Sequence, residues 1–206
     1  MEQRTEDWFA IRLGKVTASC ISKVTAKTKT GWGAERANYK AQLVAERLTG
    51  QRQEGFTNSA MQWGVDTEEA ARNAYVFLEG NSVIEEAFVV HPTIADAGAS
   101  PDGLVGDDGL LEIKCPNTAT HIETLKGAAI PAKYVGQMQW QMACTGRKWC
   151  DFVSFDPRMP DDMQLFVKRL DRDDDYIADL EKAVADFLAE VEADIAELTK
   201  IYRKDV

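Results

Sequence analysis

The chain has 206 residues, of which 45% are hydrophobic and 28% are charged. This composition is typical of a globular protein and argues against a largely disordered chain. A chain of this length can bury its own core, so we expect one domain over residues 1–206. No run of about 18 apolar residues is present, and the charged first residues lack the apolar segment of a secretory signal. We therefore expect a cytoplasmic protein without membrane contact.

The formal net charge is −10, and it is unevenly distributed. Residues 1–60 carry ten Lys and Arg against six Asp and Glu, whereas residues 171–206 carry twelve acids against five bases. A basic N-terminal part on an acidic body suits a protein that contacts DNA with one face. The same distribution fits an ordinary acidic protein with an incidental bias, and charge alone does not separate the two.

The cysteines and histidines do not form a metal-binding pattern. The chain has four cysteines with no C-x-x-C pair, and only two histidines, which argues against a Cys/His zinc site. We expect free thiols in a reducing compartment. His91 and His121 are expected to be structural residues, because no Ser–His or Cys–His pairing is evident.

Helical and strand periods alternate along the chain and predict a mixed α/β fold. A basic loop is expected at residues 25–35, and a long helix capped by Asp173 is expected at the C-terminus. Its apolar residues step by three and four from Ile177 to Leu198, which predicts one buried stripe. The other expected helices cover residues 36–49, 57–78, 118–126 and 133–145, and the expected strands cover 82–91, 110–114, 149–155 and 163–170. Thr57, Asn58 and Ser59 are the candidate caps of the second helix.

The strongest chemical signal is Ser100-Pro101-Asp102-Gly103 followed by Leu111-Glu112-Ile113-Lys114. Alternate residues of a strand share a face, so Glu112 and Lys114 point the same way, and a hairpin turn brings Asp102 beside Glu112. Two converging carboxylates suit Mg²⁺ or Mn²⁺, and the lysine can hold a water or help to deprotonate it. Taken alone the pattern is degenerate, and it also fits an Asp in a turn beside a surface Glu–Lys pair.

Further segments in matching order extend over nearly the whole chain. They are Trp8-Phe9-Ala10-Ile11-Arg12-Leu13-Gly14 with Thr17-Ala18-Ser19, Trp63-Gly64 followed by Glu68 and Ala71-Arg72, Cys115-Pro116 after Lys114, Tyr134-x-x-Gln137-x-Gln139, and Asp156-Pro157-Arg158-Met159. With them the sequence resembles the lambda exonuclease (YqaJ-like viral recombinase) family of the PD-(D/E)XK nuclease superfamily, and it is similar to a phage or prophage member. The resemblance implies a restriction-endonuclease-like α/β core: a central mixed β-sheet flanked by helices, with a long C-terminal helix.

The resemblance also implies metal and catalytic roles. Asp102, Glu112 and the backbone carbonyl of Ile113 would bind the metal, and Lys114 would orient and activate the attacking water. The metal would be Mg²⁺, with Mn²⁺ as a substitute and two ions in each active site. Phosphodiester hydrolysis by two such ions needs no protein nucleophile.

Two further polar residues are implied to take part. Glu68 would supply another acid to the metal, although it also fits an exposed helix acid beside Glu69. Gln137 would help to position the active site, although it also fits a solvated glutamine among its neighbours.

The family's DNA contacts carry over to five residues. Arg12, Ser19 and Ser100 match a pocket for a 5′-phosphate, and an arginine fork and hydroxyls suit that group. Lys29 lies in the basic loop that matches a DNA-contacting arm. Met61 falls where the family places an apolar wedge that splits terminal base pairs, and it fits a core helix residue equally well.

The implied function is a processive, Mg²⁺-dependent 5′-to-3′ exonuclease of double-stranded DNA ends. It would release mononucleotides and leave a 3′ overhang for phage recombination in the bacterial cytoplasm. The resemblance further implies a ring-shaped homotrimer around DNA and a phage single-strand annealing protein as partner. The alternatives are another PD-(D/E)XK endonuclease, which would cut circular DNA, and a non-catalytic module that binds DNA ends.

Overall fold

A mixed five-stranded sheet forms the centre of the computed structural model, which describes residues 2–29, 31–53 and 59–203. Its strand order is β10 (Leu165–Asp171), β9 (Trp149–Phe155), β8 (Gly109–Lys114), β7 (Gly103–Val105) and β4 (Val83–Ile84). β8 and β9 run parallel, and the other neighbouring pairs run antiparallel. β8 and β9 are buried almost throughout, as expected for strands covered on both faces.

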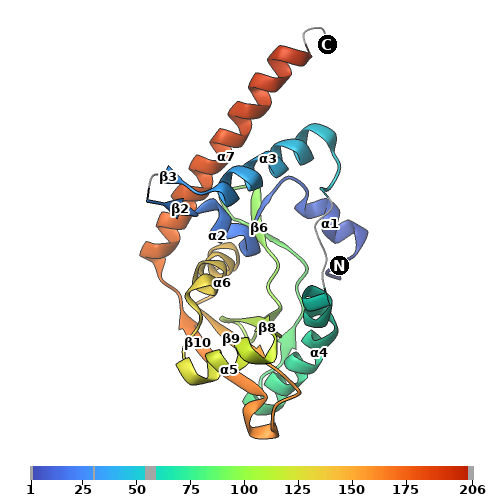
Figure 1. Cartoon of the computed structure of the whole chain (residues 1–206), viewed down its shortest axis with the longest axis vertical. Helices are drawn as coiled ribbons and strands as arrows, with labels where there is room; N and C mark the ends of the chain where they lie inside the picture. The colour runs from blue at the N-terminus through green and yellow to red at the C-terminus, as the bar shows by residue number, and fades with distance from the viewer. Residues whose placement is uncertain (1, 30, 54–58, 204–206) are drawn as a thin grey trace.

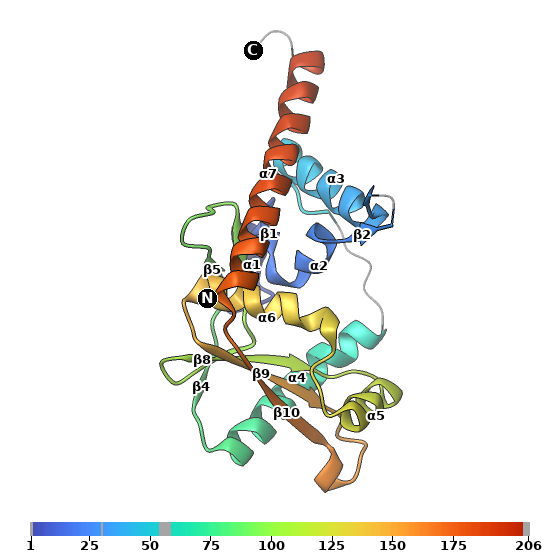
Figure 2. The same ribbon diagram turned by 90° about the vertical axis from the view of Figure 1, so that its left-hand side faces the viewer.

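Helices cover both faces of this sheet (Figures 1 and 2). α6 (Ala132–Thr145) lies on one face and α4 (Ser59–Glu79) on the other. β8 contributes to both sides, because Leu110 packs in the core under α6 while Leu111 and Ile113 pack in the core under α4. The expected mixed sheet flanked by helices is confirmed, and Leu111 and Ile113 are buried as expected.

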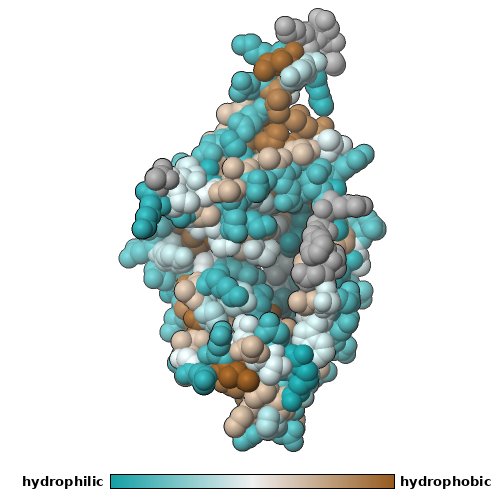
Figure 3. All heavy atoms as spheres, viewed as in Figure 1, coloured by the Kyte–Doolittle hydropathy of each residue, from teal (hydrophilic) through white to brown (hydrophobic). Residues whose placement is uncertain are grey.

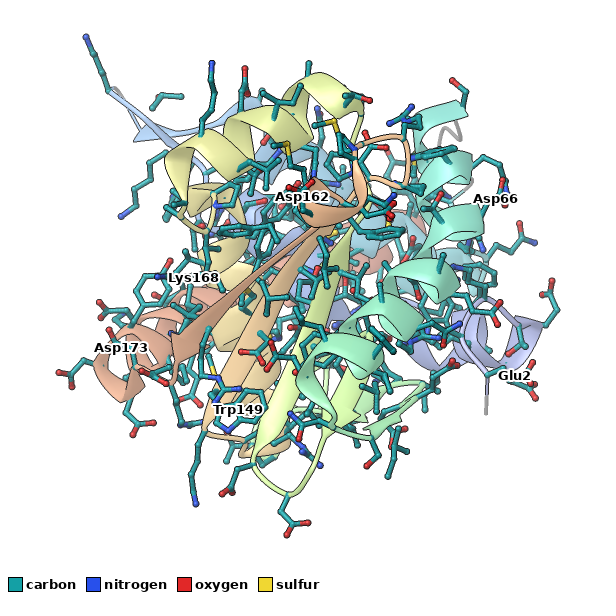
Figure 4. The ribbon with its side chains drawn as sticks, turned by 90° about the horizontal axis from the view of Figure 1, so that it is seen from below. Glu2, Asp66, Trp149, Asp162, Lys168 and Asp173 are labelled. Carbon is teal, nitrogen blue, oxygen red and sulfur yellow. The ribbon has the colours of Figure 1, made fainter. Side chains whose placement is uncertain are left out.

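Gly109 of β8 leaves room for a tryptophan ring of the neighbouring strand β9. Trp149 is the first residue of β9. Figure 4 labels it on the side of the sheet that α4 covers. Its ring covers Gly109, where a Cβ atom would lie 2.1 Å from the nearest ring carbon. The Arg169 guanidinium stacks on the same ring at 3.5 Å from its centroid. Only glycine therefore fits at position 109 without displacing the indole.

The N-terminal part forms a smaller layer above α6. Its elements are α1 (Glu6–Arg12), β1 (Val16–Thr17), a 3₁₀ turn (Ala18–Cys20), α2 (Ile21–Val24) and α3 (Ala34–Thr49), with β1 in a three-stranded sheet of order β1-β6-β5. α1 was not expected from the sequence, although Thr5 caps it by accepting a hydrogen bond from the backbone N–H of Trp8. Residues 25–35, expected as a loop, contain the hairpin of β2 (Lys27–Thr28) and β3 (Gly31–Trp32).

The predicted strand over residues 82–91 is wrong as one element. It divides into β4, which pairs with β7, and β5 (Val89–Val90), which pairs with β6 (Ala97–Ala99) in the other sheet. Between them, the carbonyl oxygens of Glu86 and Ala87 accept hydrogen bonds from the side chains of Gln3 and Trp8. The backbone there bonds to the N-terminal segment instead of to a neighbouring strand, which physically interrupts the strand.

The C-terminal helix α7 (Asp174–Tyr202) starts as predicted, because the Asp173 side chain accepts a hydrogen bond from the backbone N–H of Tyr176. Its buried stripe runs from Ile177 to Val191, but Leu198 is exposed, so the predicted stripe ends early. The last turns of α7 project beyond the body, where hydrophobic side chains gather on the surface (Figures 1 and 3). Within the described ranges, none of the helices has the length and apolarity needed to cross a membrane.

The remaining helices follow the predicted ranges closely. α5 (Thr118–Gly127) and α6 occupy the connection between the parallel strands β8 and β9. α4 begins at Ser59 in the described chain, and the other two candidate caps, Thr57 and Asn58, lie outside the described residues. β10 begins at Leu165 rather than at residue 163, because residues 161–163 form a 3₁₀ turn.

A buried aspartate ties the end of β9 to both flanking helices. Asp156 is fully buried and accepts hydrogen bonds from the Thr118 hydroxyl of α5 at 2.7 Å and from the Arg158 Nε at 2.7 Å. The Arg158 guanidinium lies 4.4 Å from the ring centroid of Trp63 on α4. Burial opposes the charged carboxylate, but hydrogen bonds from Arg158 and Thr118 outweigh it and lower the pKa of Asp156 to about 2.

We expect Asp156→Asn to lower the free energy of unfolding by about 1–3 kcal/mol at pH 7, because it removes a buried, multiply bonded carboxylate. A depressed carboxyl pKa contributes stability above the unfolded value of about 4, and the contribution is lost as pH falls through the folded value. The difference between wild type and variant should therefore shrink as the pH falls from 5 to 2 in urea unfolding. Asp162→Asn, an exposed acid in the following turn, is the control, and an equal loss in both variants would contradict the assignment.

Candidate active site

One cleft of about 560 Å³ brings together segments from α1, α4, β8 and α6. It holds nine of the eleven predicted site residues: Arg12, Ser19, Met61, Glu68, Ser100, Asp102, Ile113, Lys114 and Gln137. Glu112 is fully buried and reaches the cleft through its contacts with Gln137 and Lys114. Lys29 does not line the cleft, and it lies exposed in the turn between β2 and β3. The sequence thus predicted most of one site.

The hairpin of β7 and β8 places Asp102 beside Glu112. The register pairs Gly103 with Leu111, so Asp102 lies opposite Glu112 at the end of the hairpin. Asp102 is held there because its Oδ2 accepts a hydrogen bond of 2.7 Å from the backbone N–H of Ile113. A Cβ on Gly103 would lie 2.2 Å from a methyl carbon of Val83, so the residue after Asp102 must stay small for β4 to pack.

Glu112 is a buried carboxylate with three polar partners. Gln137 donates to Oε1 at 2.6 Å, Gln141 donates to Oε2 at 2.5 Å, and the Lys114 ammonium forms an ion pair with Oε1. The two glutamines lie four residues apart on α6, so they share the helix face that covers β8. Gln139 faces elsewhere and donates to the carbonyl of Asp171. Gln137 is therefore no solvated glutamine, and Gln141 is a site residue that the sequence analysis missed.

Two carboxylates and one ammonium lie close together in the buried part of the site. Burial, then the neighbouring charge of Glu112, raises the pKa of Asp102 well above its ordinary value, and Lys114 offsets this only in part. Burial opposes the charge on Lys114, but Glu112 and Asp102 outweigh it and raise the pKa of Lys114 above its ordinary value. Lys114 therefore stays an ammonium at neutral pH, and the two carboxylates repel one another beside it.

Glu68 faces the cleft from α4 and is not the exposed acid that the sequence also allowed. Its side chain is 16% exposed, whereas Glu69 is exposed. Arg4 pairs with Oε2, and Arg72 donates to Oε1 at 3.0 Å. In the described part of the chain, no three His, Cys, Asp or Glu side chains stand close enough to hold a metal together. Glu68 thus lines the same cleft as Asp102 but is held by arginines.

Arg12 is fixed in the cleft wall by an aromatic ring and a hydroxyl. Its guanidinium lies 4.0 Å from the Trp8 ring centroid, and Nη1 donates to Ser100 Oγ at 2.7 Å. Trp8 Nε1 donates to the same hydroxyl oxygen at 3.0 Å. Ser19 is exposed and lies 3.4 Å from the hydroxyl of Thr17. Arg12, Ser100 and Ser19 therefore line one wall, and the half-buried Trp8 belongs to the same wall.

Met61 lies at the rim of the cleft with 55% of its surface exposed. The alternative that placed it in the core is therefore wrong. Tyr134, matched by the resemblance without a role, lines the cleft, and the Lys114 ammonium lies 5.2 Å from its ring centroid. Arg4 also lines the cleft, and no sequence pattern pointed to it.

The histidines have structural contacts within the described residues, but the expected absence of a Ser–His pairing is wrong. His121 pairs with Ser154 at 2.8 Å, and both side chains are buried away from the cleft, where the other ring nitrogen of His121 bonds to the carbonyl of Met163. His91 is buried, stacks on Trp140 and hydrogen-bonds Glu181. The four cysteines are free thiols: Cys20, Cys115, Cys144 and Cys150.

Comparisons with known proteins agree on one family. The model of the YqaJ-like viral recombinase domain matches residues 7–148. Two crystal structures of LHK-Exo, an alkaline exonuclease from Laribacter hongkongensis, match with 55% identity and a TM-score of 0.91, and one of them is a complex with dAMP. Both matches cover 97% of this chain and 99% of the other chain.

A more distant structure supports the fold alone. The phage-related exonuclease from Haemophilus somnus 129PT matches with 17% identity and a TM-score of 0.73, over 89% of this chain and 96% of its own. The search of curated proteins returned no match. The chain therefore belongs to the YqaJ-like viral recombinase family and, by its close similarity to LHK-Exo, is an exonuclease of the deoxyribonuclease class.

Proposed function

We propose that this exonuclease degrades one strand of duplex DNA in the 5′-to-3′ direction with Mg²⁺ as its cofactor. The observation that carries the proposal is that one cleft holds Asp102 and Lys114 together with Arg12 and Ser100. The first pair suits phosphodiester hydrolysis, and the second suits a terminal phosphate. The dAMP bound to LHK-Exo supports DNA as the substrate.

The proposed metal ligands are Asp102, Glu112 and the backbone carbonyl of Ile113, with Glu68 as a further acid. All are oxygen donors, which hard divalent cations prefer. The closeness of Asp102 and Glu112 supports this choice, because burial and the neighbouring charge of Glu112 both raise the pKa of Asp102, and a divalent cation would offset that repulsion. When bound, two Mg²⁺ ions, for which Mn²⁺ could substitute, would neutralise phosphate charge and make a water molecule more acidic.

The chain's own residues divide the remaining work. Lys114 carries three N–H donors beside Glu112, so it would orient the attacking water by donating hydrogen bonds. Gln137 and Gln141 hold both oxygens of Glu112, which fixes the carboxylate before substrate arrives. This preorganisation avoids reorienting the carboxylate during the reaction.

The polarity follows from the proposed phosphate pocket. Arg12 offers a guanidinium fork, and Ser100 and Ser19 offer hydroxyls to a 5′-terminal phosphate. Ser100 stands two residues before Asp102 on the same turn, so a phosphate bound there would place the next phosphodiester near the metal ligands. Met61, exposed at the rim, would separate the terminal base pair, and Lys29 in the β2–β3 turn would contact the duplex outside the cleft.

We further propose a homotrimeric ring around DNA and a phage single-strand annealing protein that receives the 3′ overhang in the bacterial cytoplasm. In a ring, only the surface that lines the central channel needs to be basic in order to contact DNA. The rest of the surface can be acidic, which agrees with the net charge of −10. Light scattering should give three times the chain mass of 22.9 kDa. A monomer that still degrades long duplexes processively would contradict the ring.

Asp102→Asn should reduce cleavage of end-labelled linear duplex by more than about 100-fold, since a neutral amide is a poor ligand for a hard cation. Its thermal stability in EDTA should not fall, because the amide oxygen can keep the hydrogen bond from Ile113 while the repulsion with Glu112 is relieved. Asp107→Asn, an exposed acid in the β7–β8 turn, is the control. Near-native cleavage by Asp102→Asn would defeat the metal assignment, and cleavage of closed circular DNA by wild type would favour an endonuclease.

Arg12→Ala should lose the preference for a 5′-phosphate over a 5′-hydroxyl end. A charge-assisted hydrogen bond contributes about 1.5–3 kcal/mol, so the loss should be on the order of 10–100-fold under single-turnover conditions. Lys15→Ala, a basic residue just after α1 that does not line the cleft, is the control. If the wild type degrades both ends equally, or the variant keeps the full preference, Arg12 does not read the phosphate.

A further inference from the structure

The N-terminal segment is fastened to the turn that carries Asp102. The Gln3 side-chain amide donates to the carbonyl oxygen of Glu86 at 2.8 Å and to that of Pro101 at 2.9 Å. Pro101 directly precedes Asp102, so Gln3 binds the backbone beside the proposed metal ligand. The next residue, Arg4, is thereby placed in the cleft wall.

Arg4 has an unusual backbone conformation. Its φ is +68°, and among the described residues only Ala128 shares a positive φ without being glycine. A bulky residue adopts this left-handed region at a cost and persists there only where its surroundings hold it. Here the two hydrogen bonds of Gln3 hold the backbone next to Arg4, and the Arg4 side chain pairs with Glu68.

The two arginines that hold Glu68 differ in how firmly they are fixed. Arg72 is 16% exposed and also pairs with Glu85 at 2.5 Å, so it is anchored at two points. Arg4 is 43% exposed, and Glu68 is its one ion-pair partner within the described residues. Arg4 can therefore leave Glu68 for solvent while Arg72 stays.

We propose that Arg4 is a positioning residue that occupies Glu68 in the metal-free site and competes there with the divalent cation. The inference rests on the proposed function, in which Glu68 is a metal ligand. Glu68 lines the cleft with Asp102, and Arg4 pairs with one of its two carboxylate oxygens. Loading of the metal then requires the guanidinium to be released from Glu68.

The test measures metal binding without DNA, by titrating Mn²⁺ or Mg²⁺ into the full chain in a calorimeter. Arg4→Gln should bind the metal about two- to tenfold more tightly than wild type, the range for removing one partly screened charge pair. Arg4→Lys should fall between the two, because lysine keeps the charge without the fork. Lys182→Gln makes the same charge change at an exposed ion pair on α7 and should leave metal binding unchanged.

A double-variant cycle distinguishes competition for Glu68 from the alternative that the positive charge of Arg4 simply repels the metal ion. Glu68→Gln should weaken metal binding, and adding Arg4→Gln to it should then have no further effect. Unchanged or weaker binding by Arg4→Gln, or equal tightening with and without Glu68, overturns the role of Arg4. If metal binding is absent in wild type, or survives Asp102→Asn, the proposed metal centre itself fails, which is a different result.

Discussion

The burial of one carboxylate, that of Glu112, governs the arrangement of the site. A buried charge is costly unless it is paired and hydrogen-bonded, and Glu112 meets this condition with Lys114 on its own strand and two glutamines from α6. Because β8 and β9 are parallel neighbours, the chain must cross over between them, and α6 is the part of this crossover that covers the sheet above Glu112. Because Asp102 is opposite Glu112 in the hairpin, the same arrangement also fixes the second carboxylate.

The cleft walls are attached to this centre by polar side chains rather than by apolar packing alone. On the α4 side, Tyr75 donates to buried Asp151 at 2.8 Å, and Asp156 holds Arg158 against Trp63. On the N-terminal side, the indole of Trp8 reaches the backbone of Ala87 at 2.8 Å. Directional bonds of this kind specify where a helix lies over a sheet, which apolar contacts do only loosely. The position of each wall is therefore set by a few hydrogen bonds.

The sequence predicted the parts of the site that lie on regular elements. Strand alternation placed Glu112 and Lys114 on one face, and the family resemblance named Gln137. Helical spacing alone could have placed Gln141 on the same face as Gln137, because the two lie four residues apart. That Glu112 is buried and accepts a second hydrogen bond from Gln141 follows only from the folded structure. No sequence pattern pointed to Arg4. Its partner Glu68 lies 64 residues further along the chain, and the contact depends on the left-handed backbone conformation of Arg4.

The strand prediction for residues 82–91 failed for a related reason. Apolar β-formers are frequent there, but the hydrogen-bond partners of Glu86 and Ala87 come from the first eight residues of the chain. Local composition does not contain that information. The start of α7 was predictable from its capping residue. The end of its buried stripe was not, because it depends on where the rest of the protein stops covering the helix.

The crossover between β8 and β9 carries the two glutamines that hold Glu112, so the site depends on a non-local part of the fold. The β7–β8 hairpin is local and brings Asp102 and Glu112 together early, but the glutamines that hold Glu112 belong to the connection that closes only with the parallel strand pair. Non-local parallel pairing is slow compared with hairpin formation. The fixed geometry of Glu112 therefore depends on the β8–β9 pair and its crossover, and the hairpin alone does not provide it.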